Sequence, residues 1–407
     1  MKINHEKVWP FLIGFLLSVN IYLLPFLAAS PRATDLGSLL LGVWLLIRLA
    51  AGRQRPQPLA AVGLVALTPV IWLFFSLLGN DPPTTVLTAR WVLAIPWALV
   101  LVLIVEDRQR QESFAWGLVI GGLVNVGVII LQWLGFESLL QMVGLSSSGA
   151  NYSTFVSHQV RIPGLHGHHN ASSSVASLIV PAGFFLYYRG RIKLAHLLGC
   201  LFGLLIAIHL TSTRSPLLVS VFTVVFAAAL GRKLRQSALI GIVLLGILVP
   251  LVVVYGPPGG WARWKNTEAL VSNASERGDS GIGGLELCLE NPLGLGVTEG
   301  HSRLDGRTGI KSTHNAFLQA ALFWGLPFGL LVSVGLLLAP LRAFGGSGSP
   351  FFLTSLTAFH LCGLFMFEEH LNNPTFIILT AGLMTVTFLV NIRTGKSPAD
   401  SPADTPR

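Results

Sequence analysis

The chain has 407 residues, of which 52% are hydrophobic and only 11% are charged. Water-soluble domains carry about 25% charged residues, so this composition excludes an ordinary soluble globular domain. The formal charge of +9 does not indicate nucleic-acid binding, because the basic residues lie in short clusters between apolar runs and not along one solvated face. The composition predicts an all-α integral membrane protein.

Twelve apolar segments approach or reach the length of about 20 residues that a helix needs to cross a bilayer. We therefore expect about twelve transmembrane helices, of which the second and eighth are short enough to be partial spans. The first segment has a basic flank but no small-residue cleavage site, so we expect it to be a span and not a removed signal peptide. The segments are Trp9–Ala28, Gly37–Leu49, Leu59–Leu78, Val86–Val105, Phe114–Leu134, Ala171–Tyr187, Leu194–Leu210, Pro216–Leu230, Ala238–Val254, Ala316–Leu338, Phe351–Phe367 and Thr375–Val390.

The distribution of basic residues predicts the orientation, because cytoplasmic turns are enriched in Lys and Arg. With both termini in the cytoplasm, 17 of the 27 Lys and Arg residues fall on the cytoplasmic side. Residues 1–392 then form a single membrane domain with two longer outer loops, 135–170 and 255–315, and residues 393–407 form a disordered cytoplasmic tail. Apolar stripes in the larger loop, such as Ile282, Leu285 and Leu289, predict that this loop is partly helical.

Basic side chains recur on the predicted outer face. Arg161 opens the run 161–170 before the sixth span, and Arg214 lies in the turn 211–216 after the seventh. Guanidinium groups grip phosphate oxygens in a bidentate fork, so several that converge from different loops would suit a diphosphate. The alternative is that Arg161 and Arg214 extend to lipid phosphates as interfacial residues. The larger loop adds Arg263, Lys265, Arg277, Arg303, Arg307 and Lys311.

His314 is the candidate general base, since it stands at the mouth of the tenth span, on a helix start. An imidazole, with an unperturbed pKa near 6.5, can take a proton from a hydroxyl group at neutral pH. The alternative is a structural role for His314 in capping the helix or in hydrogen bonding near Asn315.

A metal site is not expected. His166, His168 and His169 share one loop, but no carboxylate lies nearby in the sequence. The three cysteines are far apart, which argues against a disulfide framework and against a clustered cysteine site. We therefore expect neither a metal nor a cofactor.

Several short motifs follow one another in the second half of the chain. Arg277 precedes the run 285–296, and the sequence Thr-His-Asn-Ala-Phe-Leu at 313–318 opens a Gly-containing apolar helix. Together with the run from Arg161 and the Ser-Thr-Arg-Ser turn around Arg214, this order resembles the O-antigen ligase and polymerase superfamily of bacterial inner membranes. The first five spans match only in hydrophobic character. His166-Gly-His-His departs from the family's more usual apolar-Pro pattern before Asn170.

The resemblance implies a polyisoprenoid-dependent glycosyltransferase with a GT-C-like fold, located in the inner membrane with its active site facing the periplasm. Its donor would be O-antigen polysaccharide on undecaprenyl diphosphate and its acceptor a sugar hydroxyl of lipid A-core, with membrane lipids but no nucleic acid as further partners. His314 would be the base in an inverting, metal-independent transfer. The implied diphosphate ligands are Arg161, Arg214, Arg263, Lys265 and Arg277, with Asn170, Asn315 and His169 in support.

Other functions stay open. An O-antigen polymerase shares the donor but extends a lipid-linked glycan. Its Arg-rich loops often place Gly eleven positions after Arg, whereas here those positions after Arg161, Arg263 and Arg277 hold Ser172, Ala274 and Cys288. We therefore favour the ligase. A protein-directed oligosaccharyltransferase or a teichoic or teichuronic acid polymerase of the same superfamily comes next. A twelve-helix transporter or flippase would instead carry ionisable residues near the middle of its helices.

Overall fold

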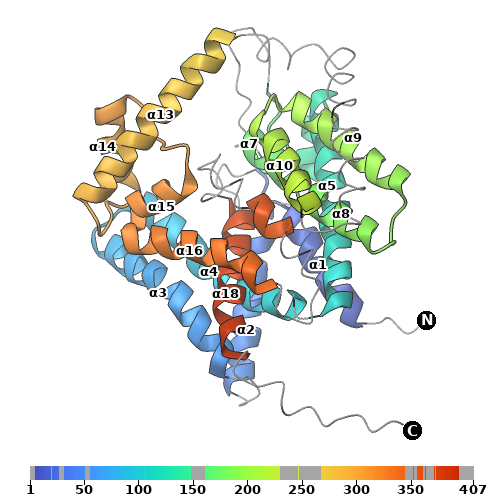
Figure 1. Cartoon of the computed structure of the whole chain (residues 1–407), viewed down its shortest axis with the longest axis horizontal. Coiled ribbons are helices and arrows are strands. Elements are labelled where there is room, and N and C mark those ends of the chain that lie inside the picture. Colours follow the sequence, from blue (N-terminus) through green and yellow to red (C-terminus); the bar gives the residue numbers. More distant parts are fainter. Residues whose placement is uncertain are drawn as a thin grey trace.

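The computed structural model describes residues 5–19, 21–26, 32–50, 56–105, 107–147, 161–229, 246, 267–343, 352, 355–360, 363, 371 and 373–393. Within these ranges the chain forms helices and no named strand, which agrees with an all-α membrane protein (Figure 1). The helices are α1 (His5–Ser18), α2 (Ala33–Ala50), α3 (Pro56–Leu78), α4 (Pro82–Val105), α5 (Arg108–Trp133), α6 (Glu137–Met142), α7 (His169–Ala176), α8 (Ile179–Tyr188), α9 (Leu194–Leu210), α10 (Ser215–Ala229), α13 (Thr267–Glu290), α14 (Val297–Thr308), α15 (Ala316–Trp324), α16 (Leu326–Ala343) and α18 (Pro374–Arg393).

Three helical stretches are long and apolar enough to cross a bilayer: Pro82–Val105, Arg108–Trp133 and His169–Tyr188. Shorter apolar helices coincide with most of the other predicted spans. The predicted span 238–254 lies outside the described residues except for residue 246, and the span 351–367 is described only in part. The count of twelve spans and the GT-C-like arrangement therefore stay predictions.

Three predicted spans are interrupted or shortened. The first was expected to reach Ala28, but α1 ends at Ser18, and the backbone N–H of Tyr22 donates to the carbonyl of Gly144 (2.8 Å). The sixth divides into α7 and α8. The tenth divides at Gly325, whose φ of +96° is in the left-handed region. A helix cannot continue through that conformation. Hydropathy alone does not predict this break, because the residues on both sides of it are apolar.

The helices pack closely where glycines meet a neighbouring backbone. Along the contact between α1 and α5, a Cβ on Gly121 would lie 2.6 Å from the Cβ of Ser18. Small residues allow helices in a membrane protein to approach one another in this way. The adjoining core contains large, fully buried aromatic side chains, including Trp91, Trp97 and Phe114.

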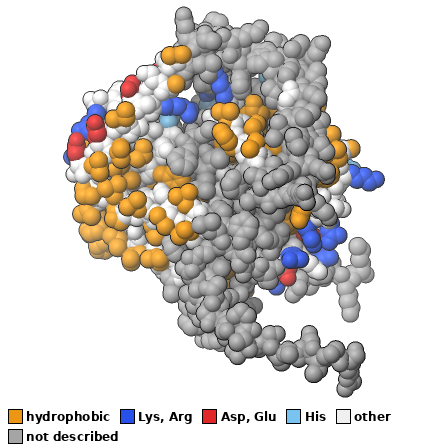
Figure 2. All heavy atoms as spheres, viewed as in Figure 1, with side chains coloured by type: hydrophobic (Ala, Val, Ile, Leu, Met, Phe, Trp, Pro, Cys, Tyr) orange, Lys and Arg blue, Asp and Glu red, His pale blue; other side chains and the backbone are white. Residues whose placement is uncertain are grey.

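The outward surface is rich in exposed apolar side chains. Phe74, Phe75 and Leu78 of α3 and Leu330 of α16 are among them. Figure 2 shows a broad apolar area on this side of the molecule, below the charged side chains at the α13 and α14 end. A contiguous apolar surface of this kind is typical of a face that meets lipid.

The described part of the larger loop, within the predicted range 255–315, contains α13 and α14, so this loop is partly helical as predicted. The apolar stripe Ile282, Leu285 and Leu289 is exposed, while Leu287 and Cys288 on another side of α13 are buried. This buried side faces α15, where the Sγ of Cys288 donates to the carbonyl oxygen of Leu318 at 3.7 Å.

Candidate functional site

Arg161 is buried and joins two segments that are distant in sequence. Its Nη1 donates to the Nε2 of His169 at the start of α7, and its Nη2 donates to the carbonyl oxygen of Ser212 at 3.3 Å. The second bond fixes the loop 161–168 beside the turn between α9 and α10. Arg161 and His169 therefore lie next to the segment that carries Arg214.

Buried polar side chains hold this loop in place. Gln132 of α5 accepts from the backbone N–H of Gly164 at 2.8 Å, and Asn125 accepts from that of Leu165 at 3.3 Å. Gly164 has a φ of +66°, and a Cβ there would lie 2.5 Å from the Cβ of Ser172. Only glycine fits this approach, so the loop has a defined path.

Arg214 stands immediately before α10 and is partly buried. Upstream of it, Thr213 is buried and its Oγ1 donates to the Oγ of Ser173 at 2.8 Å, which ties the turn to α7. The pKa of Arg214 is lowered from its ordinary value, first by burial and then by the positive charge of Arg277. The positive charge of Arg277 on α13 therefore acts on Arg214, although 63 positions separate the two residues in the sequence.

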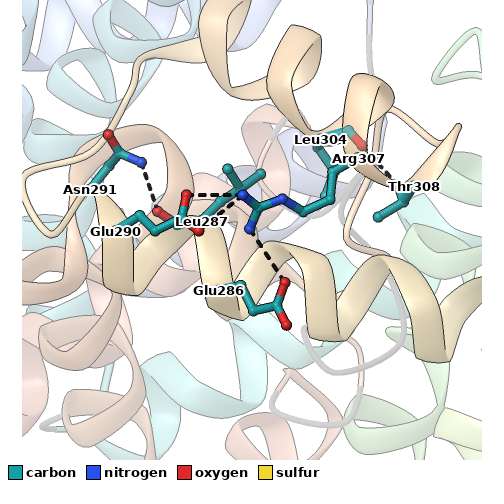
Figure 3. Close-up of polar contacts among 7 residues, drawn as sticks. All are labelled: Glu286, Leu287, Glu290, Asn291, Leu304, Arg307 and Thr308. Atoms are coloured by element: carbon teal, nitrogen blue, oxygen red, sulfur yellow. Dashed lines mark hydrogen bonds and ion pairs between the residues drawn. The ribbon is translucent and has the colours of Figure 1, made fainter.

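The other outer cations of the described residues have different surroundings. Arg307 contacts two carboxylates of α13, with its Nη2 2.9 Å from Glu290 and its Nη1 3.3 Å from Glu286, as Figure 3 shows. Arg303 pairs with Glu299 at 2.7 Å. These carboxylates neutralise both arginines. The contacts of Arg307 fasten α14 to α13, whereas the Arg303 pair lies within α14. In Figure 2, Lys or Arg side chains and a His side chain face the space between α13 and the group α7 to α10.

His314 occupies a tight turn before α15. Its φ is +52°, and its backbone N–H donates to the Oγ of Ser312 at 3.1 Å. Asn315 is the N-cap of α15, because its Oδ1 accepts from the backbone N–H groups of Phe317 (2.9 Å) and Leu318 (3.1 Å). The capping role considered for His314 thus belongs to its neighbour.

Helix α13 connects this turn with the arginines. A Cβ on Gly284 would lie 2.6 Å from the Cγ2 of Thr313, so α13 and the His314 turn are in close contact. Arg277 lies seven residues earlier, on the same side of the helix and about 10 Å along its axis at 1.5 Å per residue. One helix therefore carries the diphosphate candidate and supports the candidate base.

The three loop histidines have different contacts. The ring centroids of His168 and His169 are 4.2 Å apart, whereas the Nδ1 of His166 accepts from the Nδ2 of Asn373 at 3.3 Å. Burial, with the charge of Arg32 as a smaller cause, lowers the pKa of His166 to about 3, so it is neutral at physiological pH. Within the described residues, no three His, Cys, Asp or Glu side chains are grouped as metal ligands.

The remaining candidates divide into two groups. Asn170 is partly buried in the first turn of α7, where its backbone carbonyl accepts from the Oγ of Ser173 at 3.1 Å. Arg263 and Lys265 lie outside the described residues. Sequence reasoning missed Asn125, Gln132 and Gln319, although polar side chains within predicted apolar spans are themselves a signal of function.

Comparison with known families adds an independent observation. Residues 198–333 match the family described as O-Antigen ligase. The matched segment runs from α9 to α16 and includes Arg214, Arg277 and His314, whereas Arg161 and His169 precede it. The chain matches no curated protein.

Proposed function

We propose that this chain, which belongs to the O-antigen ligase superfamily, transfers O-antigen polysaccharide from undecaprenyl diphosphate to a sugar hydroxyl of lipid A-core. The observation that carries the proposal is that the segment matching the O-antigen ligase family, residues 198–333, contains Arg214, Arg277 and His314, with Arg277 on the same helix, α13, that contacts the His314 turn. Two like charges that approach from separate elements form a site suited to an anion. A diphosphate supplies the matching negative charge.

The proposed reaction is a single displacement at the anomeric carbon of the donor. The acceptor oxygen forms a bond to that carbon from the face opposite the diphosphate, and the bond from the carbon to the phosphate oxygen breaks. The bonding electrons leave with undecaprenyl diphosphate, and the hydroxyl proton passes to His314. The configuration at the anomeric carbon is inverted.

Arginines would stabilise the charge that develops on the leaving group. Arg214 and Arg277 would hold the diphosphate, with Arg161 and, from the larger loop, Arg263 and Lys265 assisting. Fixed cations that neutralise a leaving diphosphate lower the barrier without reorganisation during the reaction. We expect the transfer to proceed without a metal ion, since these guanidinium groups already supply the positive charge.

The proposed setting is the bacterial inner membrane, with this site on the periplasmic side. Support comes from the opposite end of the bundle, where Arg189 and Arg191 each bond to Glu112 at 2.8 Å and where Lys193 precedes α9. Basic turns of this kind favour the cytoplasmic side.

A transfer assay separates the candidate functions. Purified protein in lipid nanodiscs would receive lipid-linked O-antigen and lipid A-core, and the products would be resolved by gel mobility and mass spectrometry. Glycan attached to lipid A-core is the expected result. Lengthened lipid-linked glycan would indicate a polymerase instead, and movement of donor across a vesicle membrane without new glycosidic bonds would indicate a flippase.

A further inference from the structure

The turn that carries His314 is held by a side chain from within the following helix. Gln319 lies in α15, and its Oε1 accepts from the backbone N–H of Thr313 at 2.9 Å and from the Oγ1 of Thr313 at 3.0 Å. The Thr313 hydroxyl also lies 2.8 Å from the carbonyl oxygen of Asn315. The residue before His314 is thus tied to the residue after it and to the helix.

These hydrogen bonds restrain the backbone of His314, which is in an unfavourable conformation. His314 has a φ of +52°, a left-handed conformation that is unfavourable for a residue with a side chain. Such conformations persist where the surrounding contacts determine them. Here Gln319 holds Thr313 from the helix side, and Gly284 of α13 supports it from the other side.

The surroundings of Gln319 do not explain why this position holds a polar side chain. Its side chain is only 2% exposed, and its neighbours Ala316, Ala320 and Phe323 are apolar and buried. Because a backbone N–H can only donate, the carbonyl end of the amide must face Thr313. The Nε2 is buried and has no hydrogen-bond partner among the described residues. A buried donor without a partner lowers the stability of the folded state, so the amide of Gln319 is not explained by stability.

We propose that Gln319 and Thr313 are positioning residues, which fix the direction of the His314 imidazole toward the acceptor hydroxyl. This inference rests on the proposed role of His314 as the base. It predicts that the hydrogen bonds between Gln319 and Thr313 affect the rate of proton transfer and leave donor binding, which depends on the arginines, unchanged.

Steady-state kinetics of the full-length protein in nanodiscs test this proposal. Gln319→Leu keeps the volume and removes the acceptor, and a misplaced catalytic group can lose about 100-fold in rate. We expect kcat to fall by about 10- to 100-fold while KM for the lipid-linked donor stays within about twofold. Thr313→Val removes only the hydroxyl group and leaves the backbone N–H bond to Gln319, so it should lower kcat less than Gln319→Leu does. It also tests the proposal if Gln319→Leu does not fold.

A conservative variant distinguishes positioning from stability. Gln319→Glu keeps the acceptor oxygen and should restore most of kcat. Its carboxylate would also favour the imidazolium, so the acid limb of the pH profile should move to higher pH. Gln132→Leu is the matched control, because Gln132 is another buried glutamine that accepts from a backbone N–H, but in the Arg161 loop. That variant should raise the donor KM.

Two outcomes would overturn the inference. One is an unchanged kcat in both Gln319→Leu and Thr313→Val. The other is a loss of kcat that follows the melting temperature, with no rescue and no pH shift in Gln319→Glu. If His314→Ala itself keeps wild-type turnover, the proposed function fails. If His314→Ala is inactive and Gln319→Leu is fully active, only the positioning role fails.

Discussion

Arg214 and Arg277 carry charges of the same sign, and the charge of Arg277 adds to burial in lowering the pKa of Arg214, so this interaction does not stabilise the folded protein. Arg303 and Arg307 each contact a carboxylate. At the scale of single residues, we expect a bound anion to be stabilised most where the positive charge of Arg277 acts on Arg214.

The first prediction concerns donor binding. Arg214→Ala or Arg277→Ala should each lose about 1.5 to 3 kcal/mol of charge-assisted hydrogen bonding to the donor, which is about a 10- to 150-fold weaker Kd. Lysine at either position should restore binding only in part, because the fork geometry is lost. Binding of lipid-linked donor to purified variants measures the effect. Arg303→Ala is the control, and equal losses in the control would contradict the assignment.

The second prediction concerns His314. Its replacement by alanine should lower turnover by about 10²- to 10⁴-fold, the usual contribution of a general base, with the donor still bound. In the wild type, activity should fall on the acid side as the imidazole becomes protonated, and EDTA should have no effect. Near-normal turnover in His314→Ala, or inhibition by the chelator, would refute the histidine-base mechanism.

At the scale of elements, the sequence predicted helices better than it predicted their junctions. The predicted span Leu194–Leu210 has the same bounds as α9, because its apolar run ends at polar residues on both sides. The division at Gly325 was missed because the span was drawn from hydropathy alone, although Gly325 followed by Pro327 is a helix-stop signal. The backbone of Leu293 lies against that glycine. The interaction between the charges of Arg214 and Arg277 also depends on tertiary packing, which a local sequence pattern does not predict.

The third prediction concerns the attachment of α14. Asp81, in the turn between α3 and α4, accepts from the Oγ1 of Thr298 at 2.7 Å and from that of Thr84, whose own Oγ1 accepts from the N–H of Val297. Burial raises the pKa of Asp81, but these hydrogen bonds outweigh it and hold the pKa below its ordinary value of 3.8. Asp81→Ala should therefore release α14 and speed hydrogen exchange of its amides.

The pH dependence of this attachment follows from the same shift. Because the folded-state pKa is depressed, the stabilisation is present above pH 3.8 and is lost as the pH falls through the lower, folded value. The protection factors of the α14 amides, which correct for the intrinsic pH dependence of exchange, should thus fall only at acidic pH in the wild type. Glu299→Ala, which breaks an exposed ion pair on the same helix, should change little. A similar effect of both substitutions would show that Asp81 has no special role.

The whole molecule has two polar ends, and helix α9 runs from one end to the other, so its length gives the distance between them. It has 17 residues, so about 25 Å separates Lys193 at its start from the Arg214 turn at its end. Arg189, Arg191 and Glu112 lie at the Lys193 end, and Arg161 lies at the other. The spacing is close to the thickness of a hydrocarbon core, so the two ends should face opposite compartments.

The last prediction tests that orientation by cysteine labelling in a variant without Cys200, Cys288 and Cys362. Ser302, exposed on α14, and Lys193, exposed before α9, are the positions for single cysteines. With a reagent that does not cross the inner membrane, Ser302→Cys should react in intact cells and Lys193→Cys only after permeabilisation. The reverse pattern would put the arginines and His314 in the cytoplasm, where the proposed lipid-linked donor and lipid A-core would not meet them, and the ligase proposal would fail with the topology.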